Sequence, residues 1–252
     1  MEIIDVILLG ILQGLTEFLP VSSSGHLVLG QYLLGIKSPG NTFEILLHIG
    51  TLGSVIFVLF DDIKAIVLSL NKKSTQKLIL YITIATLPAV IIGLVFRHQI
   101  ESLFESVSSV GFALCVTGVV LILSSRFKNQ DSRHSFFSSI IIGLSQAVAI
   151  IPGISRSGFT ISASLFLGFS AKESARFSFL LSIPIISGAG VLGILGQPYE
   201  NTFSLDIILT ALSSSFIIGV IALKFLIKLL ELGKFYVFGI YCIGIGLGSI
   251  FI

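Results

Sequence analysis

The sequence predicts an all-α integral membrane protein with six transmembrane helices and two re-entrant helix hairpins, related as inverted-topology repeats. Three observations support this fold class. Hydrophobic residues make up 54% of the 252 residues and charged residues only 11%, whereas about a quarter of the residues in a soluble domain are charged. Apolar segments long enough to cross a bilayer follow one another along the chain. Two polar breaks with the same layout interrupt them.

The first predicted element is a re-entrant hairpin over residues 3–36. Residues 3–19 are mostly apolar, and Pro20 and the run Ser22–Gly25 then break any helix. The apolar run His26–Leu34 is too short to cross a bilayer, which takes about 20 residues. Two short arms around a polar break therefore favour a hairpin that returns to the face it entered. The alternative is a spanning helix followed by an interfacial one.

The rest of the chain holds six longer apolar segments and a second broken one. The first three predicted spans are Phe43–Phe60, Lys77–Phe96 and Val107–Ser125. The second hairpin covers residues 139–169, with its break at Pro152–Gly158. The last three spans are Ala175–Leu195, Leu205–Leu226 and Phe235–Ile252. No linker is long enough to separate soluble domains. Residues 1–252 are therefore predicted to form a single polytopic domain with repeat halves at about 1–125 and 139–252.

Charged loop residues orient this map in the membrane. The basic residues that it places on one side are Lys64, Lys72, Lys73, Lys77, Arg126, Lys128, Arg133, Lys172, Arg176, Lys224, Lys228 and Lys234. The other side receives only Lys37 and Arg97 of the basic residues, together with Glu2, Asp5, Glu101, Glu105, Glu200 and Asp206. Because basic loops mark the cytoplasmic side, the first hairpin enters from outside and the second from the cytoplasm. Inverted-topology repeats have this arrangement.

A constant offset of 133 residues aligns the two breaks. The matched pairs are Gly10 with Gly143, Gln13 with Gln146, Ser22 with Ser155, Ser24 with Ser157, and Gly25 with Gly158. The mismatches are Glu17 against Ile150, Ser23 against Arg156, and His26 against Phe159. If the halves meet at mid-depth, the first contributes an acid, a hydroxyl and an imidazole, and the second contributes a cation.

Gln13 and Glu17 are four residues apart, so they share one helical face. A carboxylate and an amide can hold a hard divalent cation, Mg²⁺ or alternatively Ca²⁺, whose shell is completed by phosphate oxygens and water. Polar residues bonded to neighbouring helices are the other interpretation. For Gln13 this structural interpretation is about as good as metal binding. For Glu17 it is weaker, because a carboxylate within the membrane is costly.

Both breaks precede a predicted helix start, where small residues and free amides form an anion site. The residues that predict phosphate binding there are Ser22, Ser24, Gly25, Ser155, Ser157 and Gly158. Any one serine can instead be a simple N-cap. Arg156 suits phosphate because its planar fork binds two oxygens at once and stays charged.

The sequence leaves two candidates for the nucleophile, His26 and Ser23. His26 can transfer a proton or attack phosphorus, and Ser23 can attack with His26 as its base. Glu44 and His48, also four apart, either extend the site or form an internal polar pair. His98 and His134 fall in predicted loops and receive no role.

At these residues the chain resembles the undecaprenyl-pyrophosphate phosphatase family of the bacitracin-resistance type. The stretch Gln13–His26 is similar to its glutamate-rich motif, and Pro152–Gly158 is similar to its second motif. Further similar stretches are Phe43-Glu44, Ala85–Pro88 and Phe177–Pro184. The resemblance implies hydrolysis of undecaprenyl pyrophosphate to undecaprenyl phosphate and inorganic phosphate, which recycles the carrier lipid for peptidoglycan synthesis. It also implies six spans with two re-entrant hairpins.

The resemblance further implies roles for single residues. Gln13 and Glu17 would match the acidic pair, Ser23 and His26 the nucleophile and base, and Ser155 with Arg156 the phosphate-binding pair. Ser24 would be a neighbouring phosphate contact. Many members have glutamate where Gln13 stands, which weakens metal ligation by Gln13. The implied location is the bacterial inner membrane, with the active site opening to the periplasmic face.

The partners expected are a polyprenyl diphosphate lipid, membrane lipids, a divalent cation and a second copy in a homodimer. Nothing in the composition points to nucleic acid. The main rival function is a transporter or flippase for an anionic polyprenyl lipid, since transporters also have inverted repeats with half-helices at mid-depth. The Ser23 and His26 pair beside Glu17 favours an enzyme, because a carrier needs no attacking group.

Overall fold

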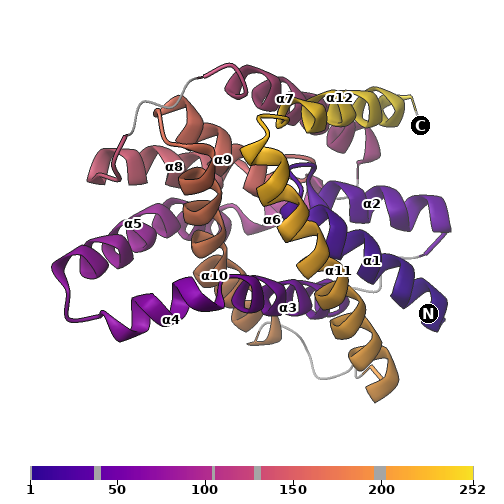
Figure 1. Cartoon of the computed structure of the whole chain (residues 1–252). Helices are drawn as coiled ribbons and strands as arrows, with labels where there is room; N and C mark the ends of the chain where they lie inside the picture. The colour runs from indigo at the N-terminus through magenta and orange to yellow at the C-terminus, as the bar shows by residue number, and fades with distance from the viewer. Residues whose placement is uncertain (1, 37–40, 104–105, 128–131, 196–202, 252) are drawn as a thin grey trace.

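The computed structural model describes residues 2–36, 41–103, 106–127, 132–195 and 203–251, and these residues form helices and turns without a strand. Figure 1 shows the helices packed around one another along the whole chain. Lys37, Glu105, Lys128, Glu200 and Ile252, which entered the predicted map, lie outside the described residues.

Each predicted hairpin consists of two short helices around a break. The first contains α1 (Ile3–Phe18) and α2 (Ser23–Leu34), and the second contains α8 (Phe136–Val148) and α9 (Arg156–Phe166). The longest of them, α1, has 16 residues, which is short of the roughly 20 residues that cross a bilayer. The arms of each pair pack against one another.

The remaining helices are longer, apart from two short segments. They are α3 (Asn41–Val58), α4 (Phe60–Leu68), α5 (Lys73–Val95), α6 (Arg97–Leu103), α7 (Val107–Ser124), α10 (Ala171–Leu195), α11 (Leu205–Glu231) and α12 (Tyr236–Ile250). Among the described residues, four helices are long and apolar enough to cross a membrane, or up to five if α3 and α4 form one span. The chain is therefore a helical multi-pass membrane protein.

Several boundaries differ from the predicted spans, and α5 and α10 each begin four residues earlier than predicted, at Lys73 and Ala171. The first predicted span ends close to its predicted end at Phe60, at the 70° bend between α3 and α4, and the further helix α4 follows with Asp61 and Asp62 in its first turn, where they favour a helix N-terminus. Helix α11 continues to Glu231, because the first stop signal is Gly233 at φ 68°. Helix α12 has only 15 residues, so the structure supports the helical membrane fold without establishing six full spans.

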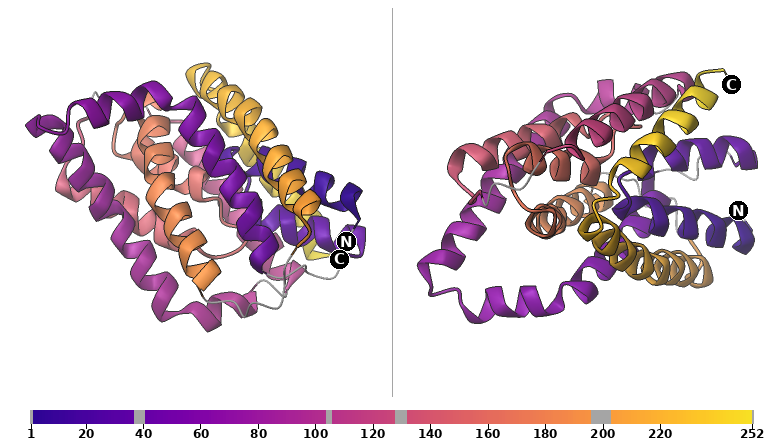
Figure 2. Two further views of the ribbon diagram at one scale, coloured as in Figure 1. Left: turned by 90° about the horizontal axis from the view of Figure 1, so that it is seen from below. Right: turned by 45° about the horizontal axis from the view of Figure 1, so that its top comes forward.

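The two halves of the chain interlock. Helix α1 of the first hairpin packs on α11, and α8 of the second hairpin packs on α5. Each hairpin thus lies against a long helix from the other half. The last helices of the halves, α7 and α12, lie side by side (Figure 2). The contacts follow the predicted repeat, in which α5 corresponds to α11 and α7 to α12.

A polar cluster joins segments that the charge map places on the cytoplasmic side. Arg176 Nε of α10 donates to Asp62 Oδ1 of α4 over 2.7 Å. His134 Nε2 lies 3.3 Å from Glu173 Oε1, and its ring stacks between Phe169 and Phe177. His134, which received no role from the sequence, therefore attaches its segment to the start of α10.

Candidate functional site

The first break presents its hydroxyls at the start of α2. Ser22 is the N-cap of this helix, and its Oγ accepts from the Gly25 N–H over 3.3 Å. Serine satisfies a free amide at this position, as helix N-termini require. Helix α2 therefore begins at Ser23, three residues before the predicted apolar arm. Ser23 consequently lies on the first helical turn, beside free backbone amides.

The second break repeats this design at the start of α9. Ser155 is the N-cap, and its Oγ accepts from the Gly158 N–H over 3.1 Å. The Oγ atoms of Ser155 and Ser157 are 3.3 Å apart, the same distance as between Ser22 and Ser24. Arg156 takes the place that Ser23 has in the first copy, so each helix start adds a different functional group.

The two breaks touch one another. A Cβ on Gly25 would lie 3.0 Å from Gly153 Cα, so the close approach of the backbones requires a glycine. Gly153 has φ 93°, and its carbonyl accepts from Thr117 Oγ1 of α7 over 3.0 Å. On the other side, Cys242 of α12 lies with its Sγ 3.6 Å from the Pro20 carbonyl. Helices α7 and α12 thus each hold one break.

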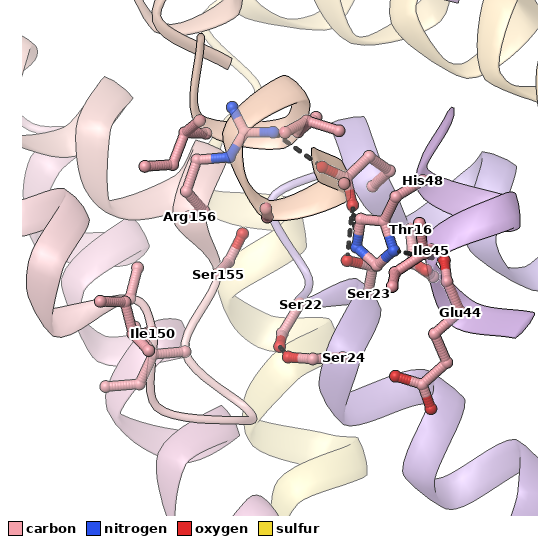
Figure 3. A pocket seen from close by; sticks show the side chains of 17 residues that line it. Thr16, Ser22, Ser23, Ser24, Glu44, Ile45, His48, Ile150, Ser155 and Arg156 are labelled. Atoms are coloured by element: carbon pink, nitrogen blue, oxygen red, sulfur yellow. Dashed lines mark hydrogen bonds and ion pairs between the residues drawn. The ribbon is translucent and has the colours of Figure 1, made fainter. Parts of the chain in front are cut away.

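A cavity of about 380 Å³ lies between the breaks (Figure 3). Its polar side chains come from α1, from both breaks with the helix starts that follow them, and from α3: Thr16, Glu17, Ser22, Ser23, Ser24, Glu44, His48, Ser155 and Arg156. Apolar residues of α3, the second break with its flanking turn, and α10 complete the wall: Ile45, Ala149, Ile150, Ile154, Ile185, Ile186, Ala189 and Gly190. The predicted residues Glu17, Ser22, Ser23, Ser24, Ser155 and Arg156 are therefore brought to one space.

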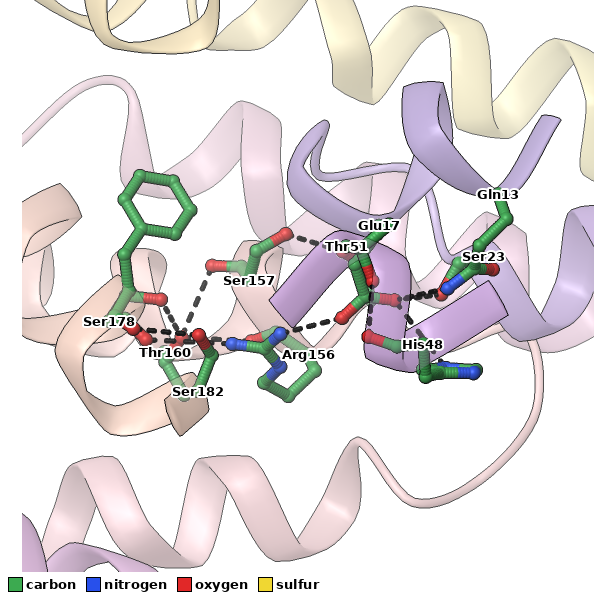
Figure 4. A network of polar contacts seen from close by, with 12 residues as sticks. Gln13, Glu17, Ser23, His48, Thr51, Arg156, Ser157, Thr160, Ser178 and Ser182 are labelled. Atoms are coloured by element: carbon green, nitrogen blue, oxygen red, sulfur yellow. Dashed lines mark hydrogen bonds and ion pairs between the residues drawn. The ribbon is translucent and has the colours of Figure 1, made fainter. Parts of the chain in front are cut away.

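Glu17 is the centre of the polar network (Figure 4). Its Oε1 accepts from Arg156 Nη2 over 2.7 Å, and its Oε2 accepts from Ser23 Oγ over 2.7 Å. Gln13 Nε2 donates to Oε2 over 3.1 Å. The side chains of Glu17 and Arg156 are only 6% and 15% exposed. A buried pair of this kind needs further hydrogen bonds to offset its desolvation, and Ser23 and Gln13 supply them.

His48 is a member of the site that the sequence left undecided. Its Nδ1 lies 2.8 Å from the Glu44 carbonyl, which can only accept, so Nδ1 carries the hydrogen. The other ring nitrogen, Nε2, lies 3.6 Å from Glu17 Oε2, and His48 lines the cavity. Glu44 Oε1 in turn accepts from Gln31 Nε2 of α2 over 3.2 Å. Spacing along α3 indicated this pair, and the contact with Glu17 assigns it to the site.

The other predicted residues lie behind the cavity wall. Gln13, Gly25, Ser157 and Gly158 are buried and support the groups that line it. His26 is 6% exposed and contacts the Ser22 carbonyl and Tyr241 of α12. The structure thus brings Ser23, but not His26, to the cavity and to Glu17. Tyr241 was not foreseen, because its apolar helix carries no signal of a site.

A larger, mostly apolar cavity of about 790 Å³ adjoins the first. It is lined by α5, the end of α8 and α10, including Val90, Leu94, Leu192 and the buried side chain of Gln146. The two cavities share Ile45, Ala149, Ile150, Arg156, Ile185 and Ala189. A polar space that opens beside an apolar one fits an amphipathic ligand with an anionic head.

Comparisons with known proteins show which family the chain resembles along its length. The family model described as bacitracin resistance protein BacA matches residues 6–248. A protein of Halothermothrix orenii named undecaprenyl-diphosphatase is 44% identical, over 98% of this chain and 96% of the relative. A protein of the same name from Desulforapulum autotrophicum is 42% identical, over 99% and 98%. One from Korarchaeum cryptofilum is 39% identical, over 98% of both chains.

Proposed function

The chain belongs to the BacA family of bacitracin resistance proteins, and from this premise we propose that it hydrolyses undecaprenyl diphosphate between its two helix breaks. The products are undecaprenyl phosphate and inorganic phosphate. One observation carries the proposal. Ser23 and Arg156, from the two different breaks, both bond to the carboxylate of Glu17 over 2.7 Å at the wall of one cavity. This arrangement supports a site in which a hydroxyl, a base and a phosphate-binding cation act together.

The diphosphate head fits the 380 Å³ cavity. The free amides at the starts of α2 and α9 and the hydroxyls of Ser22, Ser24 and Ser155 offer donors to its oxygens. Arg156 supplies the charge, and its planar fork can bind two oxygens while Nη2 stays bonded to Glu17. The isoprenoid tail extends into the adjoining apolar cavity between α5 and α10. Arg156 lines both spaces and thus stands at their junction.

Ser23 attacks the terminal phosphorus in this proposal. As the bond from Oγ to phosphorus forms, the proton of Oγ passes to Glu17 Oε2, which already accepts it in a hydrogen bond. The bond from phosphorus to the bridging oxygen breaks, and its electron pair leaves on undecaprenyl phosphate. Water then cleaves the phosphoserine and gives phosphate, while Ser23 regains a proton. Arg156 and the helix-start amides stabilise the charge on the transferred group.

His26 does not take the attacking role in this mechanism. Both of its ring nitrogens are engaged, by the Ser22 carbonyl and the Tyr241 hydroxyl, and His26 itself does not line the cavity. Ser23, by contrast, lines the cavity and has its proton acceptor in place. Of the two candidates left open by the sequence, only Ser23 lies in the cavity beside a proton acceptor. Ser23 is therefore the proposed nucleophile.

A divalent cation, Mg²⁺ or alternatively Ca²⁺, fits beside Gln13 and Glu17. Gln13 Oε1 is fully buried and has no hydrogen-bond partner in the described structure, so it is a free oxygen ligand next to a carboxylate. The described residues contain no group of three or more His, Cys, Asp or Glu side chains that could hold a metal ion. Substrate oxygens and water would therefore complete the shell, as is usual for Mg²⁺. When bound, the cation would neutralise phosphate charge.

We place the chain in the bacterial inner membrane, with the first hairpin entering from the periplasmic face and the second from the cytoplasmic face. Six spans and two re-entrant hairpins in inverted repeat are the proposed topology. The interlocked packing of α1 on α11 and α8 on α5 supports it. The cluster of Arg176 with Asp62 also supports it, because it joins segments that the charge map puts on one side. The site then opens to the periplasm.

The test is phosphate release from undecaprenyl diphosphate by purified protein with Mg²⁺. We expect release by wild type and a loss of about 10³-fold or more for Ser23→Ala and Arg156→Ala, as for other nucleophile and charge-stabilising groups. Ser145→Ala is the matched control, because the Ser145 hydroxyl bonds only its own helix, at the Ile142 carbonyl. Labelled phosphate trapped on wild type but not on Ser23→Ala would identify the nucleophile.

Transport of an anionic polyprenyl lipid was the rival function from the sequence. The relatives named undecaprenyl-diphosphatase support hydrolysis instead. If the folded wild-type protein releases no phosphate, the proposed enzymatic function is wrong. If phosphate release persists in both Ser23→Ala and Arg156→Ala, the proposed active site is wrong.

A further inference from the structure

Ser22 has an unusual backbone conformation. Its φ is 70° and its ψ is 99°, and no other non-glycine residue of the described chain has a positive φ. A side chain with a Cβ adopts this region only when surrounding contacts hold it there. Ser22 directly precedes Ser23, so its backbone sets where the Ser23 hydroxyl lies relative to Glu17.

Two residues behind the cavity hold this conformation. The Ser22 carbonyl accepts from the His26 backbone N–H over 3.1 Å and from His26 Nδ1 over 2.8 Å. Because a carbonyl only accepts, Nδ1 carries the hydrogen and Nε2 is the acceptor in the neutral ring. Nε2 lies 2.9 Å from the Tyr241 hydroxyl, which then donates. The two rings stack at 5.6 Å with an angle of 11° between their planes.

The second repeat serves as an internal comparison. Ser155, the counterpart of Ser22, has φ −78° and ψ 118°, which is ordinary extended backbone. Phe159 stands where the first copy has His26, and it has no ring nitrogen to bond a carbonyl. Both serines cap their helices in the same way. The imidazole therefore accompanies the strained backbone and the reactive serine, whereas the cap alone does not require it.

We propose that His26 and Tyr241 are positioning residues that hold Ser22 in its left-handed conformation and so keep the Ser23 hydroxyl on Glu17. This inference rests on the proposed function, since it assigns the support of the proposed nucleophile. Tyr241 orients the imidazole, the imidazole fixes the Ser22 carbonyl, and the peptide that follows carries Ser23 to the carboxylate. Neither residue lines the cavity.

The test compares one replacement that keeps a side-chain donor for the Ser22 carbonyl with one that removes it. His26→Asn can offer a side-chain N–H in place of Nδ1–H, and His26→Phe copies the second repeat. We expect His26→Asn to keep about a tenth or more of wild-type kcat, and His26→Phe to lose about 100-fold in kcat with little change in KM. Tyr241→Phe should lower kcat severalfold in the wild-type background. In the His26→Phe background it should cause no further loss of kcat. Tyr236→Phe, on the same helix and exposed, is the control.

Ser22→Gly provides the decisive background, because glycine adopts φ 70° without strain. The kcat loss caused by His26→Phe should shrink by about tenfold in Ser22→Gly. The loss in thermal midpoint caused by His26→Phe should shrink in the same background. An inactive His26→Asn in folded protein, or losses equal in both backgrounds, would overturn the inference. A wild type without phosphate release would overturn the proposed function alone, because the midpoints still decide whether His26 supports Ser22.

Discussion

Glu17 shows how a single residue organises the site. Its carboxylate receives hydrogen bonds from α1 through Gln13, from α2 through Ser23 and from α9 through Arg156. Gln13 and Ser23 belong to the first hairpin and Arg156 to the second, so the carboxylate joins the two hairpins. Because its burial is costly unless every partner is present, removal of Glu17 would affect both stability and catalysis. For this reason a change at Glu17 cannot separate the two roles, and its neighbours are better probes.

Gln13 and Gln146 form a natural pair for such a probe. They are equivalent in the repeat, both are buried, and in both the Oε1 atom lacks a partner in the described structure. Gln13 Nε2 donates to Glu17, whereas Gln146 Nε2 donates to the Ala85 carbonyl of α5. Only Gln13 therefore combines a free oxygen with a neighbouring carboxylate.

We expect chelation of divalent cations to stop phosphate release and added Mg²⁺ to restore it. Gln13→Ala should raise the Mg²⁺ concentration for half-maximal activity by about tenfold or more, because it removes one oxygen ligand. Gln146→Ala should leave that concentration unchanged. The measurement is phosphate release against free Mg²⁺ for the three proteins. An equal Mg²⁺ dependence in wild type and Gln13→Ala would exclude Gln13 as a ligand.

At the scale of elements, the contact between α7 and α12 supports both breaks. Thr117 of α7 bonds Gly153, and Tyr241 and Cys242 of α12 contact the first break. The two helices approach through glycines. A Cβ on Gly239 would lie 2.6 Å from the carbonyl oxygen of Gly118, and a Cβ on Gly118 would lie 2.5 Å from that of Gly239. Small residues allow such close packing in membranes.

Gly239→Ala should therefore destabilise the protein by about 1–3 kcal/mol, the usual cost of overpacking. It should also lower phosphate release, because the helix that carries Tyr241 must shift. Gly244→Ala is the matched control on the same helix, since a Cβ there meets nothing within 4 Å. Thermal unfolding in detergent measures the difference. Similar midpoints for the two variants would show that the glycine contact does not limit stability.

The whole molecule is held together by the exchange of hairpins between its halves. Because α1 packs on α11 and α8 packs on α5, each hairpin is supported by a long helix from the other half. In the proposed topology, the two breaks meet at the centre while the two hairpins enter from opposite faces of the membrane. This arrangement predicts which loops lie on which side of the membrane.

We expect a membrane-impermeant thiol reagent on intact cells to label Ser106→Cys, before α7, and to spare Lys72→Cys, before α5. Permeabilised cells should show both labelled, and the unaltered protein with Cys115 and Cys242 gives the background. The physical reason is that α5 crosses the membrane between the two positions in the proposed topology, so they lie on opposite sides. Labelling of Lys72→Cys in intact cells would contradict the proposed orientation.

The sequence predicted the helical membrane fold and the pairing of the two breaks. Apolar runs, the offset of 133 residues and the costly polar residues at Glu17, Ser23 and Arg156 are local properties of the chain. Helix ends were less predictable, as the end of α11 and the starts of α5 and α10 show, because lysines occur both in helices and beside them. The family resemblance rested on the same stretches, and the match over residues 6–248 confirms it.

The sequence by itself indicated most of the chemical groups at the candidate site and the two equivalent breaks that supply them. Only the tertiary structure decided how these groups pair. It placed Ser23 and His48 at Glu17 and turned His26 toward Tyr241. The reason is physical. Hydrophobicity and residue spacing act along one segment, whereas a hydrogen bond depends on the direction of side chains from helices far apart in the chain. Those directions are fixed only when α1, α3, α9 and α12 pack together.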